Sequence, residues 1–253
     1  MAPPSPSLLP SIALSLTSVN ELRALAHRNP RLHSVILAVK RVQCRRFQHT
    51  YADVLVHKDW QNAANFFLKE LYSDQDFTQR DQEFARIATT LQRVFPPSVL
   101  QVAAVLLHLH ALSEQLDYAL ATSFLSQSLA FQDDAAVRRG YVRAWRDTGQ
   151  AAARAAQIAL VVQLGQDLSR LVRITGLRTM LRLMRGPAAA AGLAHLQTFL
   201  ELGFDTFSSM QRSKAGSAEF LKLVELRETS WVARLFDTSV TSTTGTGAWP
   251  ELE

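Results

Sequence analysis

The chain has 253 residues, of which 47% are hydrophobic and 19% are charged, a balance that suits a globular protein with a sizeable core. The net charge is +5, and arginine supplies most of the positive charge. The single cysteine, Cys44, excludes an intrachain disulfide and a zinc site built from several cysteines.

The first sixteen residues contain four prolines and no charged side chain. They lack the basic start and the apolar run of a secretory signal, so we expect a flexible leader over residues 1–16. The uncharged stretches Ala155–Gln166 and Gly186–Leu200 are shorter than the ~18–20 residues that span a bilayer. We therefore expect no transmembrane segment and a cytoplasmic protein.

Helical periodicity runs along almost the whole chain, and neither hairpin signals nor alternating strand patterns occur. These features predict an all-α fold, a bundle-like single domain of roughly eight or nine helices over residues 17–237. A subdomain break is possible near residues 131–137. The Thr-, Ser- and Gly-rich tail, residues 238–253, is expected to be disordered.

Local signals place the predicted helices of the first half. The first helix is expected to begin at Thr17 or Ser18 and to end by Asn29, because Pro30 suits the first turn of the next helix. A further helix is expected over about residues 59–72. Thr78 then opens another helix, which ends before the proline pair at residues 96–97.

The second half continues this pattern. A long helix is expected to start at Pro97 or Ser98, and an Ala-rich helix is expected over Ala151–Leu164, where small side chains let neighbouring helices approach closely. The triplet Arg185-Gly186-Pro187 is typical of one helix ending and another beginning.

The run Phe66-Phe67-Leu68-Lys69-Glu70-Leu71-Tyr72 resembles the signature of the bacterial FFLEELY-motif family, whose function is unassigned. The resemblance to this family extends to residues 47–55, 109–117 and 199–204. Lys69 stands where the motif has glutamate, so position 69 is not an essential acid in this chain. The resemblance implies a helical bacterial protein, and it supplies no catalytic residues.

The first candidate site follows this run and consists of Asp76, Arg80 and Asp81. Arginine can form bidentate hydrogen bonds to carboxylates or phosphates, and an acid at a helix start is favoured by the helix dipole. The cluster could therefore bind a polar ligand. Alternatively, it caps a helix and ties the Phe66–Tyr72 segment to its neighbour.

The second candidate site consists of His110, Glu114 and Asp117, which lie on one flank of a predicted helix. A histidine and two carboxylates in this arrangement could contribute to a metal site. The Glu-x-x-His pairs of di-iron bundles do not occur in the sequence. A polar surface edge or a buried His–Asp hydrogen bond is the alternative.

The third candidate is the segment 138–185, which holds ten arginines and two acids. Arg178, Arg182 and Arg185 share one helix face and could attract nucleic acid, an acidic protein or an anionic surface. No helix-turn-helix, zinc-finger or RNA-recognition signature accompanies them, so a solvated face is the alternative.

No nucleotide-binding loop, nucleophile elbow or zinc-protease motif is present. The sequence thus favours a non-catalytic protein-interaction or scaffold module with an unknown protein partner. A helical bundle that binds a metal or small ligand at one of the polar clusters is the first alternative, and an anion-binding surface over residues 138–185 is the second. The sequence names no cofactor and leaves the oligomeric state open.

Overall fold

The computed structural model describes residues 8–71, 77–94, 97–213 and 216–237, and every regular element within them is helical. The all-α prediction is thus confirmed for this part of the chain. The predicted number of helices is wrong, because the described residues form twelve α-helices and one π-helical segment, η1. The elements are α1 (Leu8–Arg28), α2 (Pro30–Thr50), α3 (Ala52–Val56), α4 (Gln61–Phe66), η1 (Phe67–Leu71), α5 (Thr78–Val94), α6 (Pro97–Ser126), α7 (Asp134–Asp147), α8 (Ala151–Leu171), α9 (Leu177–Leu183), α10 (Arg185–Ala190), α11 (Ala194–Gln211) and α12 (Gly216–Phe236).

The additional elements are short and arise where longer predicted helices divide. The helix predicted over residues 59–72 is α4 followed by η1. The Arg-rich segment after α8 contains the short helices α9 and α10, and Gly176 precedes α9 with a φ of +84°. Glycine has no Cβ to oppose this left-handed conformation, so the chain can turn there and start a new helix.

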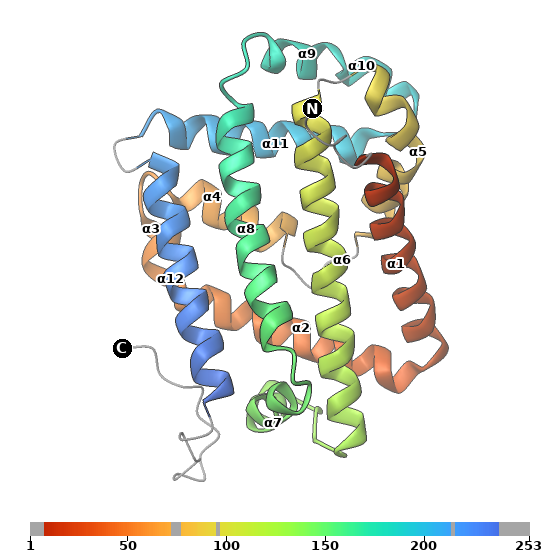
Figure 1. Cartoon of the computed structure of the whole chain (residues 1–253), viewed down its shortest axis with the longest axis vertical. Coiled ribbons are helices and arrows are strands. Elements are labelled where there is room, and N and C mark those ends of the chain that lie inside the picture. The colour runs from red at the N-terminus through yellow and green to blue at the C-terminus, as the bar shows by residue number, and fades with distance from the viewer. Residues whose placement is uncertain (1–7, 72–76, 95–96, 214–215, 238–253) are drawn as a thin grey trace, which may run out of the picture.

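The long helices form a layer in which α12, α8, α6 and α1 stand side by side, with α2, α4 and α11 crossing behind them (Figure 1). Helix α7 closes the end of the layer below α8. The central helices α6 and α8 pack on each other and on both layers. The two apolar cavities that the described residues enclose are both bordered by residues of α6 and α8.

Helix α1 begins at Leu8 rather than at the predicted Thr17 or Ser18, so most of the expected leader is helical. Pro10 does not prevent this, because it lies in the first turn, where a backbone N–H has no partner within the helix. Burial of Ile12 and Leu16 explains why the helix extends this far. Residues 1–7 and the predicted tail at 238–253 lie outside the described residues.

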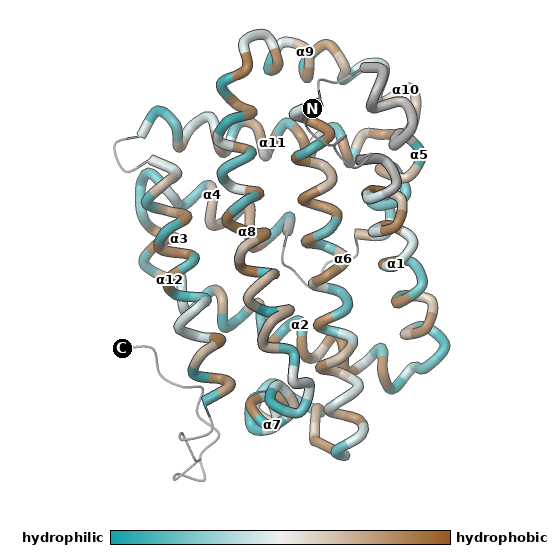
Figure 2. The backbone as a smooth tube through the Cα atoms, in the orientation of Figure 1, coloured by the Kyte–Doolittle hydropathy of each residue, from teal (hydrophilic) through white to brown (hydrophobic). Residues whose placement is uncertain are grey.

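Helix α6 is apolar enough and, at 30 residues, long enough to cross a membrane by composition and length. The prediction of no transmembrane segment did not consider this stretch. Helix α6 is the one helix among the described residues with this length and composition. More than half of its apolar window is buried inside the protein. Figure 2 shows apolar residues along α6. Helices α1, α2 and α8 pack against α6, and this central position accounts for its composition.

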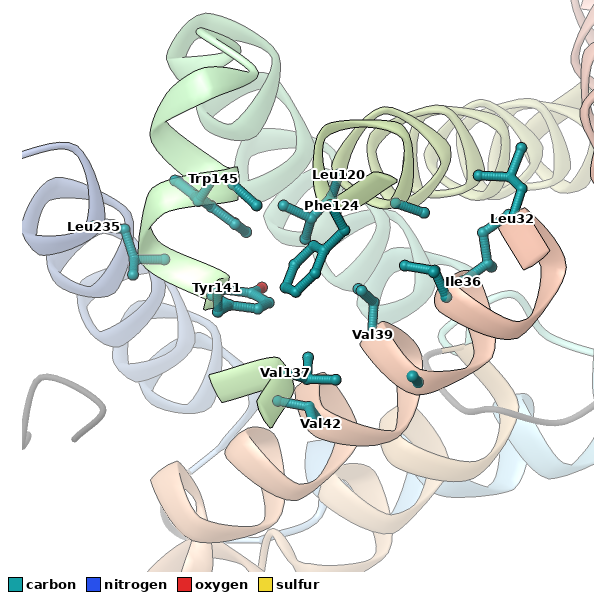
Figure 3. Packing of buried hydrophobic residues seen from close by; sticks show 14 of the residues in the cluster. Leu32, Ile36, Val39, Val42, Leu120, Phe124, Val137, Tyr141, Trp145 and Leu235 are labelled. Carbon is teal, nitrogen blue, oxygen red and sulfur yellow. The ribbon is translucent and has the colours of Figure 1, made fainter. Parts of the chain in front are cut away.

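One hydrophobic cluster joins residues from both sides of the segment 131–137, where a subdomain break was possible. Figure 3 shows Val39 of α2, Phe124 of α6, Tyr141 of α7 and Leu235 of α12 around one centre. Asp133 caps α7 by accepting a hydrogen bond from the backbone N–H of Ala136 at 2.8 Å. The loop before α7 is thus a connection within a shared core.

Helices α8 and α12 approach closely at Gly165, and this contact gives a stability prediction. A Cβ at Gly165 would lie 2.3 Å from Cδ2 of the buried Leu221. We expect Gly165→Ala to lower the free energy of unfolding by about 1–2 kcal/mol, because overpacking outweighs the gain in helix propensity.

The matched control is Gly186→Ala in α10, where a Cβ meets no atom within 4 Å. Here the free energy of unfolding should stay level or rise by up to about 1 kcal/mol. Urea denaturation of both variants measures the difference. Equal stability of the two would contradict a tight α8–α12 contact.

Candidate functional site

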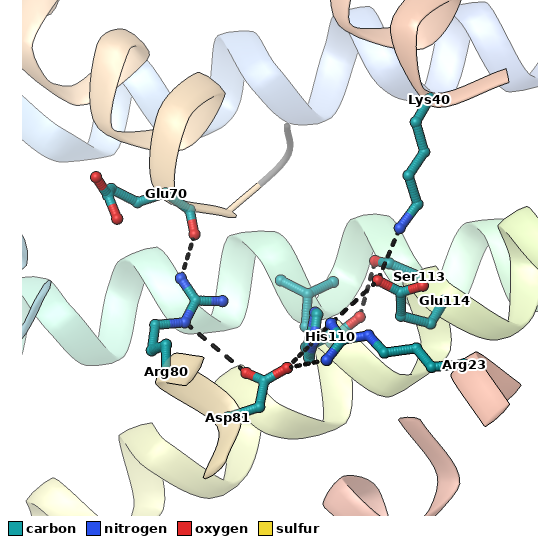
Figure 4. A network of polar contacts seen from close by, with 9 residues as sticks. Arg23, Lys40, Glu70, Arg80, Asp81, His110, Ser113 and Glu114 are labelled. Atoms are coloured by element: carbon teal, nitrogen blue, oxygen red, sulfur yellow. Dashed lines mark hydrogen bonds and ion pairs between the residues drawn. The ribbon is translucent and has the colours of Figure 1, made fainter. Parts of the chain in front are cut away.

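Two of the predicted clusters meet in one buried polar network, whose centre is the carboxylate of Asp81 in α5 (Figure 4). Asp81 is 3% exposed, and its Oδ2 accepts a hydrogen bond from Nη1 of Arg23 in α1 at 2.8 Å. Nε2 of His110 in α6 lies 3.0 Å from the same oxygen. The carboxylate therefore joins α1, α5 and α6.

Glu114, one helical turn after His110, extends this network to α2. Nζ of Lys40 donates to Oε1 of Glu114 at 2.8 Å, and Nη2 of Arg23 lies 3.7 Å from the same oxygen. Both carboxylates of the network are thus held by cations of this chain. No lone acid in it is left to attract an external cation.

Arg80 connects the network to the motif segment. Its Nη1 donates to the backbone carbonyl of Glu70 in η1 at 2.6 Å, and its Nε lies 3.8 Å from Oδ1 of Asp81. The guanidinium also lies over the rings of Phe77 and Phe199, at 4.1 and 4.8 Å from their centroids. These contacts are those of the structural alternative, in which Arg80 ties the Phe66–Tyr72 segment to its neighbour.

The other residues of the two predicted clusters do not join this centre. Asp76 lies outside the described residues. Asp117 is fully buried, accepts a hydrogen bond from Gln43, and leaves Oδ1 without a partner. Among the residues that the structure describes, no group of three or more His, Cys, Asp and Glu side chains is arranged to hold a metal ion. The described geometry therefore adds no support for a metal at His110, Glu114 and Asp117.

Two of the three arginines that share a face in the third predicted site, Arg178 and Arg185, are engaged by acids of α11. Nη1 of Arg178 lies 3.2 Å from Glu201, and its Nη2 donates to Asp205 at 2.6 Å. Nε of Arg185 donates to Glu201 at 2.7 Å, and this arginine lowers the pKa of Glu201 to about 2. Arg182 is exposed. Two of the three cations are thus already paired, which weakens their attraction for an external anion.

Charge interactions outweigh burial at both acids of the network. Burial alone would raise the pKa of Asp81, but the His110 hydrogen bond and the charges of His110 and Arg23 hold that pKa below its ordinary 3.8. Burial acts in the same direction on Glu114, and Lys40 is the main group that holds its pKa below 4.5. Both acids are therefore ionised at neutral pH.

A cavity of about 110 Å³, here called the central cavity, lies beside this network between α2, α4, α6, α8 and α12. The motif segment forms part of its wall through Phe67 and Leu68, while the preceding Phe66 faces a smaller apolar cavity of about 70 Å³. The π-helical geometry of η1 is rare and is often found at functional sites. The motif thus places its two phenylalanines against two different cavities.

The lining of the central cavity is mostly apolar but includes polar groups at two positions. At the first, Glu228 accepts hydrogen bonds from Nη1 of Arg46 at 2.6 Å and from the hydroxyl of Tyr51 at 2.9 Å. Burial and the nearby Glu228 raise the pKa of Tyr51, so its hydroxyl keeps its proton. At the second place, Arg154 lies with its guanidinium 3.9 Å from the centroid of the Trp145 ring.

Gln157 links the second place to α6. Its Oε1 accepts from Nη1 of Arg154 at 3.3 Å, and its Nε2 donates to the hydroxyl of Ser113 at 2.8 Å. An apolar cavity with a few polar groups is the usual form of a small-molecule site. The 70 Å³ cavity has only apolar walls, so the central cavity is the better candidate.

Sequence reasoning missed the polar residues of this cavity. Arg154 belongs to the segment 138–185, for which the sequence offers an anion-binding surface or a solvated face, yet it is 5% exposed. One signal was present, because Arg154, Ile158, Val161 and Gly165 follow helical spacing and Arg154 alone interrupts their small and apolar face.

The Asp81 centre yields a stability prediction. Asp81→Asn removes the negative charge that Arg23 and Arg80 face. These cations then lack that carboxylate, so the free energy of unfolding at pH 7 should fall by about 3 kcal/mol. The control is Asp205→Asn, since Asp205 pairs with Arg178 but is 51% exposed. Such a surface pair contributes under about 1 kcal/mol. Chemical denaturation that gave both variants the same loss would contradict the central role of Asp81.

The lowered pKa values of Asp81 and Glu114 fix the sign of a pH dependence. On unfolding, each acid returns toward its ordinary pKa of 3.8 or 4.5 and takes up a proton that the folded protein resists. The free energy of unfolding should therefore fall as the pH is lowered through this range toward the folded pKa values. We expect the double variant Asp81→Asn/Glu114→Gln to show a shallower fall, and denaturation at a series of pH values would refute this if the slopes matched.

The comparisons with known proteins identify a family but no chemistry. Neither a curated protein nor a solved structure matches the chain significantly. One family model matches residues 22–242, which include the polar network and every residue that lines the central cavity. The chain therefore belongs to the family described as Domain of unknown function (DUF8198).

Proposed function

We propose that this protein binds a small organic molecule in the central cavity. The observation that carries the proposal is an apolar space of about 110 Å³ into which Arg46, Tyr51, Arg154, Gln157 and Glu228 also turn. Pockets for small molecules combine apolar walls with a few polar groups that orient the ligand.

The size of the cavity limits what it can hold. An engineered apolar cavity of ~150 Å³ binds benzene, so about 110 Å³ accommodates one small ring or a short branched chain after slight movement of side chains. The motif segment supports the same proposal, because Phe67 and Leu68 line the cavity from η1. Kinship with the bacterial FFLEELY-motif proteins and a cytoplasmic location stay predictions from the sequence.

The described geometry favours this function over the two others that the sequence raised. A scaffold needs a continuous docking surface, but the exposed large apolar side chains, which include Leu14, Val56, Leu183 and Leu226, are spread over α1, α3, α9 and α12. An anion-binding surface over residues 138–185 is weakened at Arg178 and Arg185, which are paired with acids of α11, although Arg138, Arg139, Arg143 and Arg182 are exposed. Both functions stay predictions without a supporting contact in the described residues.

The proposal predicts that filling the cavity prevents binding. We expect benzyl alcohol to bind the wild-type protein saturably in an NMR titration, and Val161→Phe to weaken this binding at least about tenfold, because the new ring occupies the ligand's space.

The matched control is Val142→Phe, which adds the same bulk at a partly buried position in α7 that does not line the cavity. This variant should bind like the wild type, and thermal unfolding should show that both variants are folded. Absence of saturable binding by the wild type, or equal binding by a folded Val161→Phe variant, would refute the proposal.

A further inference from the structure

Arg154 is a buried cation with little to balance its charge. It is 5% exposed, and its one side-chain hydrogen bond within the described residues is the 3.3 Å contact with the neutral Gln157. An arginine keeps its proton in a protein and offers five N–H donors. Burying such a charge without an anion costs several kcal/mol, so this position calls for a partner.

The nearby acids do not supply that partner. Glu228 lines the same cavity, but it is engaged by Arg46 and Tyr51. Asp117 interacts with Arg154 electrostatically but forms no ion pair with it within 4 Å, and burial raises the pKa of Asp117. Of the charged groups that line the cavity, the two arginines therefore exceed the one carboxylate by a single charge.

Trp145 is the aromatic residue that contacts Arg154 at the wall of the central cavity. Its ring lies 3.9 Å from the Arg154 guanidinium carbon, and this cation–π contact offsets part of the cost of burial. Trp145 is 4% exposed, and its Nε1–H has no hydrogen-bond partner in the described residues. The indole N–H is therefore a donor that no described acceptor uses.

We propose that the ligand of the central cavity is a small monocarboxylate with an apolar body, and that Arg154 binds its carboxylate. The inference rests on the proposed function and specifies its ligand class. A carboxylate matches the paired N–H groups of a guanidinium and brings the single negative charge that the cavity lacks. The apolar body faces the wall formed by Phe67, Ile158 and Val224.

The test compares three probes of similar shape, benzoate, benzyl alcohol and benzylamine, by NMR titration of the full-length protein at pH 7. We expect benzoate to bind the wild type at least about tenfold more tightly than benzyl alcohol, and benzylamine to bind most weakly, because charge-assisted hydrogen bonds form only with the anion. Benzoate binding no tighter than benzyl alcohol binding would overturn the inference.

Two variants locate the preference at Arg154. Arg154→Met keeps an unbranched side chain without the charge and should bring the affinities for benzoate and benzyl alcohol within about threefold of each other. Arg143→Met removes the same charge from an exposed position in α7 and should behave as the wild type. A benzoate preference that persisted in Arg154→Met would overturn the role of this residue. The wild-type comparison is decisive even if Arg154→Met fails to fold.

The salt dependence of benzoate binding distinguishes binding in the cavity from adsorption to exposed arginines. Binding of the neutral probe, benzyl alcohol, distinguishes failure of the carboxylate inference from failure of the proposed function. Benzoate in the buried site should bind with nearly the same affinity from about 0.05 to 0.5 M salt, whereas adsorption to surface arginines would weaken steeply and overturn the inference. Saturable benzyl alcohol binding without a preference for benzoate would overturn only the inference that the ligand is a carboxylate. Failure of every probe to bind would overturn the proposed function as well.

Discussion

The Asp81 carboxylate is the contact on which the arrangement of the motif segment depends. It binds Arg23 of α1 and His110 of α6, and its neighbour Arg80 binds the carbonyl of Glu70 in η1. These groups hold four elements that are far apart in sequence, and burial makes a missing partner costly. The network therefore fixes where η1 lies, and η1 in turn places Phe67 against the central cavity.

The network and the central cavity are adjacent but differ in ion pairing, because each cation of the network lies within 4 Å of a carboxylate and Arg154, among the described residues, does not. In the network, Asp81 and Glu114 are met by Arg23, Lys40 and Arg80, and each acid stays ionised. In the cavity, Arg154 faces an aromatic ring and a neutral amide. Removing one partner of a buried ion pair is costly, which ties the network to the fold, whereas a buried cation beside a cavity and without a described carboxylate partner is the basis of the proposed ligand class.

Helices α6 and α8 connect these two regions. Ser113 follows His110 by three residues in α6 and accepts the hydrogen bond of Gln157, which contacts Arg154 in α8. The same α8 face continues to Gly165, where α12 packs closely through Leu221. One face of α8 thus carries polar side chains of the cavity at one end and the close contact with α12 at the other.

Local chemistry in the sequence was sufficient for the fold class and for several helix ends. Helical spacing of apolar residues and the absence of hairpin signals predicted an all-α protein, and Pro30 and Pro97 open α2 and α6 as expected. The beginning of α1 was not predictable in this way, because burial of Ile12 and Leu16 by distant residues extends the helix back past Pro10. The membrane-length apolar run of α6 was likewise accounted for only when its neighbours were seen to cover it.

For the candidate site too, the sequence determined one part and the tertiary structure the other. The sequence by itself identified Arg80, Asp81, His110 and Glu114 as unusual polar residues near apolar stripes, since residue type and spacing are local properties. Only the tertiary structure brought Asp81 to His110, paired both acids with Arg23 and Lys40, and distinguished the buried Arg154 from the other arginines of its segment. Burial and ion pairing depend on helices that meet from distant parts of the chain, and that information is absent from any single helical stretch of sequence.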